Sequence, residues 1–400
     1  MLALALGAPG AIAQSAQGRQ FAQDFDAMWR AVDEGYAYFD GNRSAWRRAR
    51  ETWRPRAARA ATRAQFVSAL EGALATLHDD HASLSESIPD SPRQVPCGTD
   101  IWAAWKDGAA VVEAVRTYSD ADVAGVHPGH SITMISGIGV DRAVRDLLGK
   151  SAADTGARDW ALRRALAGRH AGARRVTVAQ ASGLRTLDIE PRAASTANAP
   201  PVIGRRIGED RDLGYVRIRS ASLADPGFAG QFDAALDFLK DTRALILDLR
   251  EVCDPAPQDV LRAILGRFAT AAAPWRQREP RGAARVVDAV APRGTPYRAP
   301  LVVLVDRWTA GDGEALAAGL QAVAKARLVG TAMAGMRGEV REARLPHSGI
   351  VVRFPAEKSF TADGTPREQV RPTLVIDLAA PQGGPGDPIL YQALKLLERK

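Results

Sequence analysis

Apolar runs and helical periodicities alternate along the second half of the chain. Three runs are typical of strands buried on both faces of a parallel sheet: LGYVRI (213–218), ALILDLR (244–250) and PLVVLVD (300–306). Apolar residues at helical spacing predict helices over 226–240, 257–269 and 312–325. Short strands are also expected at 339–345 and 349–354. This alternation predicts a layered α/β domain over residues 205–380, followed by a C-terminal helix within residues 381–400.

The first part of the chain has the periodicity of amphipathic helices. Its apolar residues recur every three or four positions: Phe21, Phe25, Met28, Val32 and Tyr36. A second helix is expected to begin at Thr62, because Thr62 and Gln65 have the spacing of a capping box. Residues 18–85 are therefore predicted to form a helical bundle.

Between these two regions the pattern changes to short strands separated by glycine turns. Residues 101–115 predict a hairpin with its turn at Asp107 and Gly108. A strand around 132–135, an amphipathic helix after it and two strands within 174–189 complete a small β-rich module, residues 97–192. Pro-containing segments flank this module on both sides and are expected to be linkers.

Charge and cysteine content narrow the possible functions. The 400 residues carry a net charge of +7, but the arginines are spread along the chain among acidic residues. No basic block or basic–aromatic stripe predicts nucleic-acid binding. The only cysteines, Cys97 and Cys253, are expected either to form a disulfide or to remain two buried thiols. The sequence has no Cys/His cluster with the spacing of metal ligands and no glycine-rich loop of the phosphate-binding type. Neither a metal nor a cofactor is therefore predicted.

The N-terminus favours an exported protein. Residues 1–17 contain a short apolar run that ends in Ala-Ile-Ala before Gln14, as in a secretory signal peptide, although a basic start is missing. A periplasmic or secreted location is therefore expected, the alternative being an ordinary apolar N-terminus. No other apolar run is long enough to predict a transmembrane helix.

The stretch VLVDRWTAGDGEALAAGL, residues 303–320, is the most informative for chemistry. An apolar strand enters a glycine-rich turn that opens directly into a helix, an arrangement that hydrolases use to present a nucleophile and to bind an oxyanion. The turn, residues 309–314, reads Thr-Ala-Gly-Asp-Gly-Glu and has neither Ser nor Cys at its apex.

Four segments, in this order, resemble the tail-specific (C-terminal processing) serine peptidases, in particular their tricorn- and IRBP-like branch. They are LHDDHASL (77–84), the PDZ-like AGVHPGHSITMISGIGV (124–140), the strands GYVRI, LILDLR and VLVDRWT, and GTPRE (364–368). The resemblance covers nearly the whole chain. It implies a ClpP/crotonase-like layered α/β core, an N-terminal helical bundle and a small PDZ-like domain, in which His130 replaces the usual Asp.

The same resemblance implies an incomplete catalytic site. The nucleophilic Ser of the family falls on Gly311, whereas His81 matches the base and Glu368 the residue that orients it. Where the tail-specific branch has a Lys base, this chain offers Met336. Since glycine has no side chain, no acyl-enzyme can form through residue 311.

The oxyanion hole of the family is altered as well. It corresponds to the backbone of Asp312 and to the turn 251–257, represented by Cys253 and Asp254. The usual glycine-rich sequence of that turn is replaced by Glu-Val-Cys-Asp-Pro-Ala-Pro, and proline has no N–H to donate. The sequence therefore predicts a peptidase fold that has lost catalysis.

If catalysis is lost, the family resemblance still implies that the chain binds polypeptide, above all protein C-termini. Strand addition to the PDZ-like module is expected near Gly125, Val126, Gly129 and Ile132. Two alternatives remain open: an active peptidase with a relocated nucleophile, or a structural partner of envelope proteins. The replacement nucleophiles considered are Thr309, Asp312, Ser83 and Ser85. His81 and Glu368 also have simpler interpretations, as hydrogen-bonding and ion-pairing groups, and Asp312 and Glu314 as partners of the helix dipole.

Overall fold

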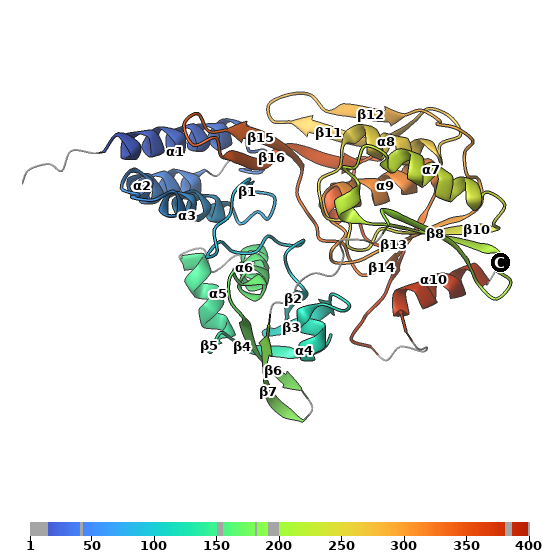
Figure 1. Ribbon diagram of the computed structural model, residues 1–400, viewed down its shortest axis with the longest axis horizontal. Helices are drawn as coiled ribbons and strands as arrows, with labels where there is room; N and C mark the ends of the chain where they lie inside the picture. Colours follow the sequence, from blue (N-terminus) through green and yellow to red (C-terminus); the bar gives the residue numbers. More distant parts are fainter. Residues whose placement is uncertain are drawn as a thin grey trace, which may run out of the picture.

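A computed structural model describes residues 15–40, 43–149, 155–180, 182–190, 200–380 and 386–398. Figure 1 shows helices α1 to α3 beside a β-rich module and a larger α/β core. Within these described residues, no helix is both long enough and apolar enough to cross a bilayer. The predicted signal segment lies almost entirely outside the described residues, as does part of the C-terminal segment 381–400.

A six-stranded sheet forms the centre of the core, in the order β17-β14-β13-β10-β9-β8. Neighbouring strands from β17 to β9 are parallel, and β8 is antiparallel to β9. Their bounds are Val202–Ile207 (β8), Leu213–Ile218 (β9), Ala244–Asp248 (β10), Leu301–Val305 (β13), Arg327–Gly330 (β14) and Leu374–Val375 (β17). The three apolar runs predicted from sequence are thus three adjacent central strands.

Helices cover both faces of this sheet. Leu245, Leu247 and Val303 belong to one apolar cluster together with helices α7 (Phe228–Phe238), α8 (Gln258–Gly266) and α9 (Asp312–Ala324). Ile246 and Leu304 point the other way, toward α10 (Pro388–Glu398). Because side chains alternate along a strand, continuous apolar runs are what such a two-sided sheet requires. The predicted α/β layering is confirmed.

A second sheet connects the core to the N-terminal helices. Its strands run in the order β1-β16-β11-β12, and β15 also pairs with β16. The bounds are Ser83–Leu84 (β1), Ala273–Pro280 (β11), Val286–Val290 (β12), Glu339–Arg344 (β15) and Val351–Thr361 (β16). Strands β11 and β12 were not among the predicted elements, because their mixed charged and apolar residues lack a clear alternation.

The N-terminal helices share one apolar cluster with β16. Helices α1 (Ala16–Gly35), α2 (Ser44–Ala58) and α3 (Arg63–Leu74) pack through Phe25, Met28 and Phe66. Val352 and Phe354 of β16 belong to the same cluster. At the start of α3, the Thr62 hydroxyl accepts the Gln65 N–H, as the capping motif predicts. The Gln65 side chain instead accepts the N–H of Ala61, one residue before Thr62.

The β-rich module forms its own sheet, in the order β2-β3-β4-β6-β7, with β5 paired to β4. Its elements are β2 (Ile101–Lys106), β3 (Ala109–Val115), α4 (Asp120–Ala124), β4 (Ser131–Ile135), β5 (Ile138–Gly139), α5 (Val140–Leu148), α6 (Thr155–Ala167), β6 (Arg174–Gln180) and β7 (Gly183–Ile189). Helix α6, which apolar periodicity does not predict, buries Trp160, Ala161 and Leu166 in the apolar core of the module. Strands β2 and β7 lie at the two ends of this strand order, and the two-residue β5 pairs with β4 alone among the described strands.

Candidate active site

The turn between β13 and α9 places Gly311 at the N-terminus of the helix. Gly311 has φ 53° and ψ −109°, a left-handed conformation that residues with a side chain rarely adopt. The Ala310 N–H donates to the carbonyl of Val252, which joins the turn to residues following β10. The turn therefore has the sharp, constrained geometry that hydrolases use to expose a nucleophile.

Glu314 holds this turn from inside the protein. Its buried carboxylate accepts the backbone N–H groups of Gly311 at 2.9 Å, Gly335 at 2.7 Å and Met336 at 3.0 Å. Burial raises the pKa of Glu314 to about 7, while Arg367 and the three amides favour the carboxylate. Beyond its expected role at the helix dipole, Glu314 thus links the turn to the segment 335–336.

His81 faces the position where a side chain of residue 311 would be. An ideal Cβ built on Gly311 would lie 3.2 Å from Nε2 of His81, and the other heavy atom within 4 Å is Cε1 of the same ring. Nδ1 of His81 lies 2.6 Å from the carbonyl oxygen of Arg337. A carbonyl only accepts, so Nδ1 carries the hydrogen and Nε2 is left as an acceptor toward Gly311.

Two further features keep His81 neutral and fixed. Burial lowers the pKa of His81 below its usual 6.5. Its backbone N–H donates to Asp79, whose other carboxylate oxygen accepts the Tyr36 hydroxyl at 2.7 Å. The neutral imidazole, with its hydrogen on Nδ1, is therefore oriented as a general base requires, and its Nε2 faces a residue without a side chain.

Glu368 does not occupy the position expected of a residue that orients His81. The Nδ1 partner is the Arg337 carbonyl, and one Glu368 oxygen is buried without a hydrogen bond to any residue that the structure describes. The carboxylate of Glu368 instead interacts electrostatically with the side chains of Tyr38 and Arg337. We therefore correct the expected role: a backbone carbonyl replaces the carboxylate, which no sequence pattern could have revealed.

The hydrogen bonds of Thr309, Ser85 and Asp312 do not favour the alternative of a relocated nucleophile. Thr309 is fully buried, and its hydroxyl bonds to Leu249 O at 3.0 Å and to the Asp306 backbone. The Ser85 hydroxyl accepts the N–H of Val351 at the start of β16. Asp312 uses its carboxylate to accept the Ala256 N–H at 2.9 Å. These three side chains thus have structural partners.

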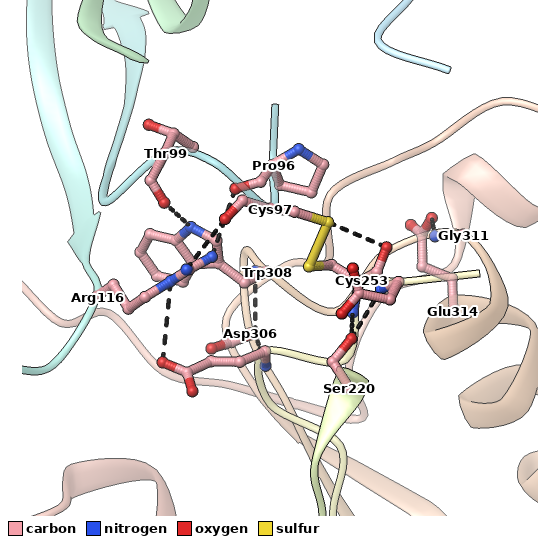
Figure 2. The surroundings of a disulfide bond; sticks show 12 residues. Pro96, Cys97, Thr99, Arg116, Ser220, Cys253, Asp306, Trp308, Gly311 and Glu314 are labelled. Carbon is pink, nitrogen blue, oxygen red and sulfur yellow. Dashed lines mark hydrogen bonds and ion pairs between the residues drawn. A yellow bond between two sulfur atoms is a disulfide. The ribbon is translucent and has the colours of Figure 1, made fainter. Parts of the chain in front are cut away.

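The expected oxyanion hole is occupied within the protein. The N–H groups of Cys253 and Asp254 both donate to the hydroxyl of Ser220, at 2.8 and 2.7 Å (Figure 2). The Asp312 N–H lies at the first position of α9, where a helix provides no internal acceptor. One of the expected donor groups thus remains at the helix terminus, while the amides of Cys253 and Asp254 are directed to Ser220.

Cys97 and Cys253 form a disulfide, which decides between the two possibilities left by the sequence. With Asp254 they are also the grouping of three possible metal ligands found among the described residues. Both sulfurs belong to the disulfide, so they offer no thiolate to a metal.

The residues expected to bind peptide do not form an edge. Val126 is fully buried and Ile132 is 2% exposed, both in the apolar core of the β-rich module. Ile132 lies on β4, between β3 and β6. The amides of Gly125 and Gly129 donate to Asp122 O and Val112 O. We correct this expectation: strand addition to the module requires β2 or β7, because a central strand has no free ladder.

The fold and the elbow facing His81 define the class of serine-hydrolase-type layered α/β proteins. Comparison with protein families is consistent with that class. Residues 212–376 match peptidase family S41, and residues 18–75 match the tricorn protease C1 domain. Together the two matches and the fold support a relationship to peptidase family S41, the tail-specific peptidases. No curated protein sequence matches it significantly.

Solved structures share the fold over nearly the full chain. The photosystem II D1 C-terminal processing protease aligns with TM-score 0.57 at 20% identity, covering 91% of this chain and 94% of its own. Mature CPAF complexed with lactacystin aligns with TM-score 0.60 at 14% identity, covering 96% and 98%. A lipoprotein from Streptococcus agalactiae aligns with TM-score 0.53 at 11% identity, covering 100% and 99%. At these identities the likeness establishes the fold alone.

Proposed function

We propose that this S41-family chain binds extended polypeptide without hydrolysing it. The observation that carries the proposal is the pairing of Gly311 with His81. An oriented base lies 3.2 Å from where a Cβ of residue 311 would be, and glycine supplies no hydroxyl there. Without a nucleophile no acyl-enzyme forms, and Ser220 also occupies two amides of the expected oxyanion hole.

We further propose that residues 97–192 act as a PDZ-like domain that captures protein C-termini. An extended peptide would add as a strand to β2 or β7, the edges of its sheet. Pull-downs with peptides that have free or amidated C-termini test this part. We expect preferential recovery of the free termini, and equal recovery would argue against C-terminal capture.

An exported location is part of the same proposal. The apolar residues 1–17 resemble a signal peptide. The Cys97–Cys253 disulfide supports export, because disulfides persist in oxidising compartments.

The central test is labelling of the purified protein with a fluorophosphonate probe, together with digestion of denatured casein. We expect no labelling and no cleavage by the native chain. A Gly311→Ser variant provides the matched comparison, with Gly311→Ala as its control, since the two differ only by the hydroxyl. Robust labelling or cleavage by the native chain would contradict the proposal and favour a relocated nucleophile.

A further inference from the structure

The Cys97–Cys253 disulfide joins two functionally different parts of the site. Cys97 lies in the segment that leads into β2, an edge strand of the β-rich module. Cys253 lies in the turn after β10, where its own amide and that of Asp254 donate to Ser220. The bond spans 156 residues of sequence and lies beside the Gly311 elbow in Figure 2. It therefore connects β2, one of the two proposed peptide edges, to the expected oxyanion turn.

The disulfide lies in a partly exposed part of the chain, where we expect an external thiol to reach it. Both cysteines are half-buried rather than enclosed in a core, and so is Asp254 next to them. An oxygen of Asp254 lies within 4.8 Å of the sulfurs, so its charge disfavours an approaching thiolate without blocking it. A disulfide that only stabilised the core would not need to lie at this surface.

Non-covalent contacts across the same junction would remain after reduction. Arg116 donates to the carbonyl oxygens of Cys97 at 3.1 Å and Pro96 at 3.4 Å, and it lies 3.9 Å from Glu251. The Trp308 indole N–H donates to the carbonyl of Thr99 at 2.8 Å. Breaking the disulfide should therefore loosen the turn 251–254 against residues 96–99 without separating the module from the core.

We propose that Cys97–Cys253 is a thiol–disulfide exchange site that controls access of extended polypeptide to this junction. This inference rests on the proposed polypeptide binding. A thiolate of a dithiol reductant attacks one sulfur and forms a mixed disulfide, and the other cysteine leaves as a thiolate and takes a proton. The second thiol of the reductant then releases the first cysteine. Two electrons pass from the dithiol to the cysteine pair, and the reductant becomes the disulfide.

The oxidised form is the closed form. The bond keeps residues 251–254 against the entry to β2, where an incoming chain would have to lie. Reduction removes that covalent constraint, and we expect the affinity for unfolded polypeptide to rise roughly tenfold, the size of a typical coupling between sites.

The experiment uses the full chain in three forms: oxidised, reduced with dithiothreitol under native conditions, and the double variant C97S/C253S. Alkylation and intact mass count the free thiols, and hydrogen exchange follows the amides of residues 251–254. Fluorescence anisotropy with labelled, denatured casein measures affinity. The reduced and C97S/C253S forms should bind alike and about tenfold more tightly than the oxidised form. Glu251→Gln, which removes the ion pair with Arg116 but keeps the disulfide, should remain sensitive to dithiothreitol.

The outcomes separate this inference from the proposed function. If all three forms bind casein equally, polypeptide binding stands and redox control is wrong. If the bond resists dithiothreitol until the protein unfolds, or if dithiothreitol changes C97S/C253S as much as the native chain, redox control is also wrong. If no form binds polypeptide, the proposed function fails and the gating role fails with it.

Discussion

Glycine at position 311 adopts a backbone conformation that favours glycine, yet its surroundings leave room for a side chain. The one contact closer than 3.4 Å that a Cβ would make is with Nε2 of His81, at 3.2 Å. Hydrolases with a nucleophile elbow accept this strained conformation at their catalytic residue. The turn thus has the geometry of a nucleophile elbow, with no side-chain hydroxyl at residue 311.

This geometry gives the Gly311→Ser variant a definite pH dependence. A serine hydroxyl next to Nε2 would react with a fluorophosphonate only while His81 is neutral. Because burial lowers the pKa of His81, the neutral form dominates at pH 7 and is lost as the pH falls through the lowered pKa. The labelling rate should be constant above pH 7 and fall with a midpoint below 6.5. A midpoint above 7, or labelling that survives His81→Gln, would contradict the role of His81.

Ser220 provides a second test at the same site. Its hydroxyl accepts the amides of Cys253 and Asp254, so a Gly311→Ser variant still lacks those oxyanion donors. Removing one such donor from an active enzyme costs about 10²–10³ in rate. We expect Gly311→Ser to label slowly and the further change Ser220→Ala to raise its labelling rate about tenfold or more. Ser222→Ala, two residues away, serves as the control, and equal effects of both changes would exclude this explanation.

The β13–α9 connection shows how a secondary-structure junction is fixed. One carboxylate oxygen of Asp306 accepts the N–H groups of Glu251 at 3.1 Å and Trp308 at 3.0 Å, and it lies 3.2 Å from the Thr309 hydroxyl. These bonds tie the end of β13 to the end of β10. Sequence periodicity predicted both strands but not this link, because the bonding residues are 55 positions apart.

Asp306→Asn and Asp306→Ala should therefore differ strongly. Asn keeps the accepting oxygen, whereas Ala leaves buried donors without a partner and should cost about 3 kcal/mol of unfolding free energy.

Burial raises the pKa of Asp306 from 3.8 to about 6. Ionisation is thus disfavoured in the folded state, and native stability should fall relative to Asp306→Asn as the pH rises from 4 to 6, by up to about 3 kcal/mol. Denaturant unfolding at several pH values measures this, and an equal loss for Asn and Ala at pH 7 would contradict it.

Helices were predicted more completely than strands. Apolar spacing identified α1, α3, α7 and α8, since each buries one stripe against a sheet or neighbouring helices. It also identified α9, whose residues Gly313 to Leu320 are all buried. Helix α6 was missed, because Arg158, Arg163 and Arg164 interrupt its apolar residues. Those arginines stack on Trp105, Trp102 and Trp160. Arginine stems cover apolar surface in this way, so polarity alone is a poor guide to burial here.

At the scale of the whole molecule, a small apolar junction joins the β-rich module to the core. Val95, Trp102, Ala114, Ala167 and Trp308 form one buried apolar cluster. Four of the five belong to residues 95–167, and Trp308 comes from the turn that precedes Gly311. The junction thus places the module directly beside the elbow.

Trp308 variants test whether this junction keeps the module attached. Trp308→Ala should lower the unfolding free energy by about 3–5 kcal/mol and increase cleavage by a nonspecific protease, because a large buried ring is lost. Trp308→Phe keeps most of the apolar contact but loses the bond to Thr99, so it should cost about 1–2 kcal/mol. Urea unfolding and limited proteolysis provide the measurements. A Phe variant as damaged as Ala would mean that the hydrogen bond, not packing, maintains the junction.

The sequence alone determined the elements whose information is local. Continuous apolar runs specified the central strands, and helical spacing specified most helices. The ordered motifs also predict that Gly311 corresponds to the nucleophile of the family that the chain resembles. Only the tertiary structure decided which groups meet there. The His81 ring hydrogen-bonds to a carbonyl 256 residues away, and Cys97 forms a disulfide with a cysteine 156 residues away. The Ser220 hydroxyl accepts hydrogen bonds from amides of a turn more than 30 residues later. Periodicity records which face of an element is buried, whereas contacts between distant segments depend on how whole layers pack, which no local pattern encodes.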